Sequence, residues 1–126
     1  QKVVYALSER GTAIRAARVL VLGIAYKPNI NDVRESPAVE IIELLLKLGA
    51  EVSYSDPHVP RIPPMRNYDL DMTSVPLERE SIGGYDCVLI ATDHDAFDYD
   101  MLRRHARLIL DTRGRYRERS ENVILA

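Results

Sequence analysis

The sequence contains a single cysteine, no long apolar run and no signal-peptide pattern. One thiol, Cys87, can form neither an internal disulfide bond nor a zinc site built from several cysteines. No apolar run approaches the roughly 18 residues that a membrane-spanning helix needs. The first residues lack the charged and apolar regions of a cleavable signal. We therefore expect a cytoplasmic chain with no membrane partner.

The sequence also has no large excess of positive or negative charge. The sequence has 17 Lys and Arg residues and 19 Asp and Glu residues, which leaves a formal charge of −2 at pH 7. This balance argues against a nucleic-acid partner. Several arginines after residue 102 make the carboxyl end basic, and we expect them to form an intramolecular or intersubunit charge surface. With 126 residues and 46% hydrophobic content, the chain suits one globular domain.

Short apolar runs alternate with helical segments along the sequence. The nearly continuous apolar runs are typical of strands that are buried on both faces of a sheet. Strands that alternate with helices predict an α/β fold, here a Rossmann-like three-layer αβα sandwich with a mainly parallel sheet. Strands are predicted at residues 18–24, 51–55, 86–91 and 108–110, with shorter ones at 72–75 and 122–125, and helices at 38–48, 77–82 and 97–107.

The predicted helix at 38–48 carries signals at both of its ends. Ser36 stands at the N-cap position, and Pro37 occupies the first helical position, where its missing N–H costs little. Gly49 stands where a helix commonly ends in the left-handed conformation. These residues predict a helix that packs on a sheet.

The segments that follow the predicted strands hold the candidate site, because ligands on parallel sheets gather at the carboxyl ends of strands. Lys27, Arg34 and Arg113 lie in these segments, and cations that converge on one crevice suit a phosphate or a diphosphate. In the alternative interpretation, Arg34 pairs with Asp32 or Glu35, and the other two cations are only solvated. The residues alone leave both interpretations open.

The turn after the first strand lacks the glycines of a dinucleotide site. A Rossmann fingerprint, Gly-x-Gly-x-x-Gly, lets backbone amides approach a pyrophosphate. Here residues 23–28 read GIAYKP and contain one glycine. The sequence therefore argues against a chain that binds NAD by itself.

Two other groups of reactive side chains are assigned structural roles. Cys87 lies within a predicted buried strand, with no positive group placed to lower its pKa, so we expect a small hydrophobe and not a nucleophile. Asp93, His94 and Asp95 precede a predicted helix, and we expect them to cap and solvate its start. Although such residues can bind metals, we predict no metal site.

Three segments resemble the UDP-glucose/GDP-mannose dehydrogenase family. The longest is residues 19–37 (VLVLGIAYKPNINDVRESP), which is similar to the start of the family's C-terminal, UDP-binding domain. The others are residues 54–60 (YSDPHVP) and residues 86–94 (DCVLIATDH), the latter leading to residues 110–113 (LDTR). The resemblance covers nearly the whole chain. The first two segments are most similar to members that act on UDP-N-acetylhexosamines.

The resemblance implies an activity, a cofactor and four binding residues. Enzymes of this family oxidise the C6 hydroxyl of a nucleotide sugar to a carboxylate in two NAD-dependent steps, for polysaccharide biosynthesis. By this resemblance Tyr26, Lys27 and Arg113 contact the UDP-sugar substrate, and Arg34 reaches the NAD. These implied roles agree with the phosphate interpretation of the cations at the strand ends.

The resemblance also implies which functional parts lie outside this sequence. In the family, NAD is bound mainly by an N-terminal domain, and the catalytic cysteine with its assisting lysine and aspartate lies upstream of the region matched here. We expect residues 1–16 to be the tail of the preceding interdomain helix and linker, and residues 17–126 to be the UDP-binding domain. We expect no catalytic residue in this fragment. Its expected partners are the UDP-sugar and the remaining domains of a homo-oligomeric parent enzyme.

Two other classes of function remain open from the sequence. The first is a non-catalytic Rossmann-like binding or regulatory module, which would keep the fold without the enzyme. The second is a self-sufficient NAD-binding protein, against which the missing glycines count. The sequence also does not distinguish UDP-glucose from a UDP-N-acetylhexosamine as the substrate.

Overall fold

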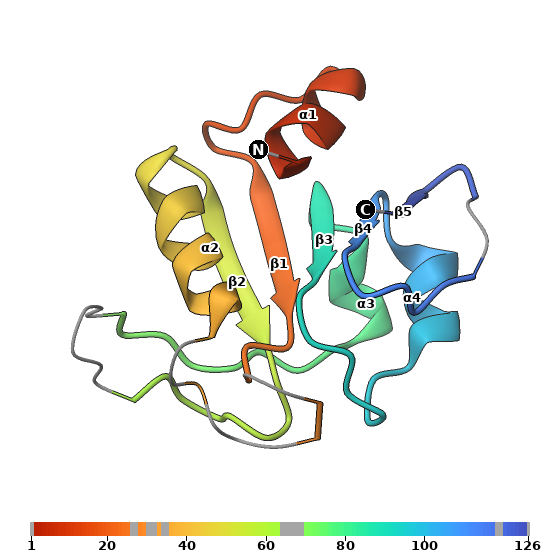
Figure 1. Ribbon diagram of the computed structural model, residues 1–126. Coiled ribbons are helices and arrows are strands. Elements are labelled where there is room, and N and C mark those ends of the chain that lie inside the picture. Colours follow the sequence, from red (N-terminus) through yellow and green to blue (C-terminus); the bar gives the residue numbers. More distant parts are fainter. Residues whose placement is uncertain are drawn as a thin grey trace.

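Parallel strands form one sheet with helices on both of its faces (Figure 1). The computed structural model describes residues 2–25, 28–29, 33, 36–63, 70–117 and 120–125. Its helices are α1 (Lys2–Glu9), α2 (Pro37–Lys47), α3 (Arg79–Ile82) and α4 (Tyr99–His105). Its strands are β1 (Arg18–Leu22), β2 (Glu51–Ser55), β3 (Cys87–Ile90), β4 (Ile109–Asp111) and β5 (Val123–Leu125), in the order β2-β1-β3-β4-β5. Every neighbouring pair of these strands is parallel.

β1 contributes to the hydrophobic core on both faces of the sheet. Val19 and Val21 join a buried cluster that contains side chains of α1 and α2. Leu20 and Leu22 join a second cluster, on the other face, with side chains of α3 and α4. This alternation is the two-residue period of a strand, and burial of each such side chain contributes about 2 kcal/mol. The predicted three-layer αβα sandwich is therefore confirmed.

The ends of α2 form as the sequence predicts. The Ser36 hydroxyl accepts a hydrogen bond from the backbone N–H of Ala38 at 3.3 Å, and Pro37 is the first residue of the helix. Gly49 has a φ of 92°, in the left-handed region that allows the chain to turn sharply into β2.

The first helix, α1, packs on the sheet next to β3. Its residues Val3, Ala6 and Leu7 are buried in the same cluster as the side chains of α2. The division of the chain at residues 16 and 17 stays a prediction. No helix in the described part of the chain is long and apolar enough to cross a membrane.

The excursion between β2 and α3 differs from the prediction. A strand was expected at 72–75, but of these residues only Thr73 pairs, in an isolated antiparallel bridge with Arg61. The backbone N–H of Ile62 also donates to the carbonyl of Met72 at 3.0 Å. The Ser74 N–H donates to the carbonyl of Pro60 at 2.8 Å, so two backbone hydrogen bonds flank one bridge, and the pairing is too short to form a further strand pair.

The helices after this excursion are shorter than predicted. The helix expected at 97–107 is α4, which spans Tyr99–His105. It begins at Tyr99 because Asp98 is the N-cap and accepts a hydrogen bond from the Met101 N–H at 3.1 Å. The helix expected at 77–82 is the single turn α3. The predicted edge strand at 122–125 is confirmed as β5, which pairs only with β4 in the named sheet.

The strand order creates a topological switch point between β1 and β3. From β1 the chain passes through α2 to β2 on one side, and then forms β3 on the other side of β1. Ligands of open α/β sheets bind outside the carboxyl ends of strands at such a point. The candidate site therefore belongs among the residues that follow β1 and β3.

Candidate functional site

The segments that follow β1 and β3 lie in direct contact. Gly23 has a φ of 78°, and a Cβ at this residue would lie 2.5 Å from the Cβ of Thr92. The Thr92 hydroxyl donates to the carbonyl of Ala25 at 2.7 Å. Gly23 is required both for its positive φ and for the absence of a side chain. Thr92 therefore occupies the space in which a side chain at residue 23 would lie.

The Asp56 carboxylate enters the same turn from the neighbouring strand. Asp56 directly follows β2 and is 1% exposed, and its Oδ2 accepts from the N–H groups of Ile24 at 2.8 Å and Ala25 at 3.1 Å. Its Oδ1 accepts from the N–H of His58 at 2.8 Å. Backbone amides of this kind hold the phosphates in dinucleotide turns. In this chain they bind an internal anion.

His94 connects this carboxylate to the segment after β1. The ring is fully buried, and its Nε2 lies 2.9 Å from Oδ2 of Asp56. Its Nδ1 accepts from the backbone N–H of Asn29 at 2.7 Å. The expectation that His94 helps to solvate the start of a helix is wrong, because Asp98 caps α4 and His94 faces the interior.

Asn29 binds the loop after β3 through its side chain as well. Its Nδ2 donates to Oδ2 of Asp95, and its Oδ1 accepts from the backbone N–H of Asp95, both at 3.0 Å. Asn29 has a φ of 63°, a left-handed conformation that asparagine tolerates better than most residues. Asp56, His94 and Asn29 were not predicted to form a connected group. The available signal was that all three follow strands, so that parallel order brings them to one edge.

Arg113 is the predicted site residue that the structure describes. It follows β4, and its Nε donates to the carbonyl of Ala91, just beyond β3, at 2.7 Å. Its backbone N–H donates to Oδ1 of the buried Asp111 at 3.0 Å, which fixes the turn. The side chain is exposed, and within the described residues its two terminal nitrogens have no hydrogen-bond or ion-pair partner. They are therefore available to a phosphate.

Beside Arg113, a second arginine has a structural role. The Arg115 guanidinium lies 4.5 Å from the centre of the Tyr99 ring, and its Nη1 is 3.8 Å from Oδ1 of Asp93. Burial, with Asp93 close by, raises the pKa of Tyr99 far above the ordinary value for a phenol. Tyr99 therefore stays protonated and supports the turn after β4 as a packing residue.

The other three predicted site residues cannot be compared with the structure. Tyr26, Lys27 and Arg34 lie outside the described residues. Of the four predicted binding residues, only Arg113 is placed, next to the carboxyl end of β3. Its predicted role in substrate binding stays a prediction.

Cys87 behaves as the sequence predicts. The side chain is fully buried in β3, and burial raises the pKa of its thiol from 9.0 to about 12. Since the thiolate is the nucleophilic form, this thiol is unreactive near neutral pH. Across the described ranges, no group of three or more His, Cys, Asp and Glu residues is placed to hold a metal ion.

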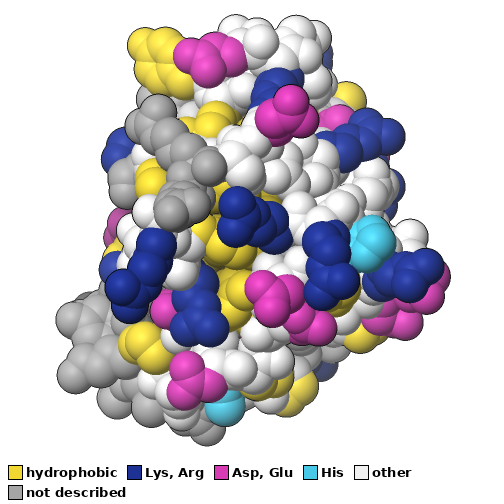
Figure 2. Space-filling model, turned by 90° about the vertical axis from the view of Figure 1, so that its right-hand side faces the viewer, with side chains coloured by type: hydrophobic (Ala, Val, Ile, Leu, Met, Phe, Trp, Pro, Cys, Tyr) yellow, Lys and Arg dark blue, Asp and Glu magenta, His cyan; other side chains and the backbone are white. Residues whose placement is uncertain are grey.

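The basic carboxyl end forms ion pairs within the chain. Arg107 lies 3.6 Å from Asp86, and Arg115 pairs with Asp93 as described above. Figure 2 shows the face beside α4 and β5, on which basic and acidic side chains are interspersed. Of the expected intramolecular or intersubunit charge surface, these ion pairs show intramolecular contacts.

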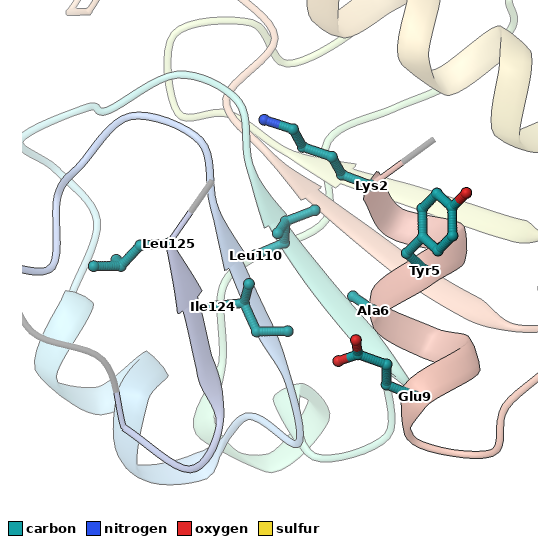
Figure 3. Close-up of a pocket in the computed structure, with 7 residues that line it drawn as sticks. All are labelled: Lys2, Tyr5, Ala6, Glu9, Leu110, Ile124 and Leu125. Carbon is teal, nitrogen blue, oxygen red and sulfur yellow. The ribbon is translucent and has the colours of Figure 1, made fainter.

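A hollow of about 400 Å³ lies away from these strand ends, between α1 and the last two strands. Figure 3 shows that Lys2, Tyr5, Ala6 and Glu9 line it from α1, and that Leu110, Ile124 and Leu125 line it from β4 and β5. It contains none of the predicted site residues. Its lining is mainly aliphatic, without converging cations for a phosphate.

The fold and the site define a Rossmann-like α/β domain whose candidate ligand-binding edge lies at the β1/β3 switch point. The chain belongs to the UDP-glucose/GDP-mannose dehydrogenase family, whose UDP binding domain matches residues 20–118. A UDP-N-acetyl-D-mannosamine dehydrogenase from Methanococcus maripaludis is 40% identical over 86 residues, which are 67% of this chain and 18% of that protein. A UDP-glucose 6-dehydrogenase from Rhizobium meliloti is 31% identical over 117 residues, which are 89% of this chain and 26% of that protein.

A solved structure with the same fold supports this assignment. The structure of a UDP-D-ManNAc dehydrogenase from Pyrococcus horikoshii superposes with a TM-score of 0.75 at 25% identity. The superposition covers 97% of this chain and 28% of that one. The chain thus spans about a fifth to a quarter of the curated relatives described above.

Proposed function

We propose that this chain is the nucleotide-sugar-binding part of an NAD-dependent UDP-sugar 6-dehydrogenase. Such an enzyme oxidises the C6 hydroxyl of the sugar to a carboxylate, with UDP-glucose or a UDP-N-acetylhexosamine as the substrate. The parent enzyme is a cytoplasmic homo-oligomer in this proposal. The family match and the names of the relatives support the substrate class.

The exposed guanidinium of Arg113 is the observation that carries the proposal. It lies at the carboxyl ends of β3 and β4, where an α/β sheet binds its ligand, and its Nε bond to Ala91 holds it in place. A guanidinium can bind a diphosphate through two parallel hydrogen bonds. In our proposal Arg113 binds the substrate together with Tyr26 and Lys27.

The turn after β1 does not fit a dinucleotide. The amides of Ile24 and Ala25 already donate to Asp56, and Thr92 fills the space beside Gly23. We therefore assign most of the NAD site to other domains of the parent enzyme and only one contact, from Arg34, to this chain. Titration of the chain with NADH, followed by fluorescence, is expected to give no tight binding.

In our proposal this chain binds the substrate and shields it from water, and it does not catalyse the reaction. In our proposal no catalytic residue lies in the chain, and the buried, protonated Cys87 is not a nucleophile. The chain would orient the diphosphate and exclude water from a cleft that the remaining domains complete. The 126-residue chain by itself is therefore expected to show no dehydrogenase activity.

Calorimetric titration with UDP tests the proposal. We expect weak, saturable binding that falls at least about tenfold in Arg113→Ala and in Lys27→Ala, since a charge-assisted bond to a phosphate contributes about 1.5–3 kcal/mol. Arg79→Ala provides the control, because Arg79 is an exposed arginine at the start of α3, away from the carboxyl ends of the strands.

Three results would contradict the proposal. UDP affinity unchanged in Arg113→Ala would place the binding site away from the carboxyl ends of β3 and β4. An equal loss in Arg79→Ala would indicate attraction by general positive charge. Absence of UDP binding by the unmodified chain would contradict a nucleotide site in this part of the enzyme.

A further inference from the structure

A buried line of hydrogen bonds joins the segments that follow β1, β2 and β3. It runs from Oδ2 of Asp56 through the His94 ring to the backbone N–H of Asn29, over 2.9 and 2.7 Å. We propose that His94 is a positioning residue for UDP binding, which holds the segment after β1 in its binding conformation. The proposal rests on the proposed function, because Tyr26 and Lys27 belong to that segment.

The two contacts fix where the proton of the His94 ring lies. A backbone N–H can only donate, so Nδ1 must accept from Asn29 and carries no proton. The Asp56 carboxylate accepts, so Nε2 carries the proton. The ring is therefore a neutral imidazole that donates at one nitrogen and accepts at the other. A protonated imidazolium would have no lone pair for the Asn29 N–H.

The segment after β1 is anchored on both sides of residues 26–27. Before them, Ile24 and Ala25 donate to Asp56. After them, the Asn29 backbone donates to His94. The Asn29 side chain forms two hydrogen bonds with Asp95, the residue after His94. Loss of the His94 ring would release the backbone bond of the second anchor and leave the first anchor intact.

The environment of the ring makes this connection rigid. His94 is 0% exposed, and its ring centre lies 4.7 Å from that of His58 and 5.5 Å from that of Phe97. Water cannot reach the ring to replace a lost partner, so the two hydrogen bonds restrict the loop more than exposed bonds would. Among the described titratable side chains, Asp56 bonds to the ring and His58 packs against it, while the Asp95 carboxylate accepts from Asn29.

Two substitutions separate the roles of the two ring nitrogens. In His94→Asn, the amide oxygen Oδ1 replaces Nδ1 and is the same number of bonds from Cα. It can therefore still accept from the Asn29 N–H. In His94→Gln, the amide nitrogen can still donate to Asp56, but the acceptor for Asn29 is lost. Both variants shrink a buried ring, so they share the packing cost and differ in the contact that the proposal needs.

The first measurement needs no substitution. Long-range ¹H–¹⁵N correlation spectra of the unmodified chain distinguish the two neutral tautomers of a histidine. We expect protonated Nε2 and unprotonated Nδ1 for His94, and slow hydrogen exchange at the Asn29 amide. A proton on Nδ1 would overturn the proposal.

The second measurement is UDP affinity, with the unfolding midpoint of each variant measured in parallel. We expect about tenfold weaker binding in His94→Gln and a change within about threefold in His94→Asn, as for loss of one backbone hydrogen bond. A purely structural role would destabilise both variants and weaken UDP binding equally. That equality, or UDP binding unchanged in folded His94→Gln, would overturn the positioning role while the proposed function stands.

The remaining outcomes are equally decisive. If His94→Gln does not fold, His94→Asn carries the test, and loss of UDP binding by the folded Asn variant would overturn the proposal. If the unmodified chain does not bind UDP, the proposed function fails, and the positioning role fails with it.

Discussion

The carboxyl edge of the sheet contains two regions that are built alike in sequence but differ in burial. At the ends of β1, β2 and β3, Asp56 and His94 are 1% and 0% exposed and bind only to other parts of the chain. Beyond β4, Arg113 is exposed and uses one side-chain nitrogen, Nε, to hold its position. Each of these residues is a polar side chain shortly after a strand of the sheet.

The difference shows that polar residues after strands can serve two separate purposes. A carboxylate with four internal donors has no capacity left for a ligand, so Asp56 shapes the loop. A guanidinium with free terminal nitrogens can bind an anion, so Arg113 is the candidate for binding. Substitutions in the buried region should therefore change stability first, and a substitution at Arg113 should change binding first.

Replacement of Asp56 should have the largest effect on stability. Asp56→Ala leaves the amides of Ile24, Ala25 and His58 and the His94 ring without their acceptor. We expect the free energy of unfolding to fall by about 4 kcal/mol, measured by urea denaturation with circular dichroism. Asp71→Ala is the control, because its carboxylate is 83% exposed and pairs only at the surface. An equal loss of unfolding free energy in Asp56→Ala and Asp71→Ala would contradict a special role of the buried region in stability.

Gly23→Ala should have the next largest effect. A Cβ at Gly23 would meet Thr92 at 2.5 Å, and its φ of 78° adds strain. We expect a loss of about 3 kcal/mol, of which about 1 kcal/mol comes from the φ angle. The matched control is Gly11→Ala, since Gly11 has a φ of 75° and no atom within 4 Å of a built Cβ. A loss of the same size at Gly11 would mean that the contact with Thr92 is unimportant.

Alkaline pH should weaken the sheet interior more gradually. Burial raises the pKa of the Cys87 thiol from 9.0 to about 12, and burial with the nearby Asp56 raises the pKa of Tyr54 from 10.0 to about 12. The unfolded chain loses these protons first, so stability present below about pH 9 should be lost as the pH rises toward 12. Each group can contribute up to about 1.4 kcal/mol per pH unit. When urea unfolding is measured between pH 8 and 11, the free energy of unfolding should fall less steeply with pH in Cys87→Ala than in the unmodified chain. The same pH dependence in both would contradict this account.

The sequence was sufficient for elements whose signals are local. Ser36, Pro37 and Gly49 specify the ends of α2 through the conformation of the residue itself or of its immediate neighbours. Burial on both faces makes β1 and β3 continuous apolar runs, which the sequence displays directly. The parallel order then predicts which loops share an edge, and Arg113 lies at that edge as expected.

The sequence was not sufficient for contacts between distant loops. His94 stands between two aspartates, a pattern that is usual for a solvated helix start, and its burial depends on Asp56, which is 38 residues away in the chain. The predicted strand at 72–75 failed for a related reason, because its partners in space provide only an isolated bridge. Polar partners separated by tens of residues leave no periodic signal.

Replacement of Arg113 should have the smallest effect on stability. It is therefore the strictest test of the difference between the buried region around Asp56 and the exposed Arg113. Arg113→Ala removes one hydrogen bond, to Ala91, from an exposed side chain, and we expect the free energy of unfolding to change by less than about 1 kcal/mol. Arg113→Lys keeps the charge and loses the Nε donor, so it should bind UDP with an affinity between those of the unmodified chain and the alanine variant. Urea unfolding and UDP titration of both variants check these values. A stability loss as large as that of Asp56→Ala would mean that Arg113 also shapes the loop, and that burial does not separate the two purposes.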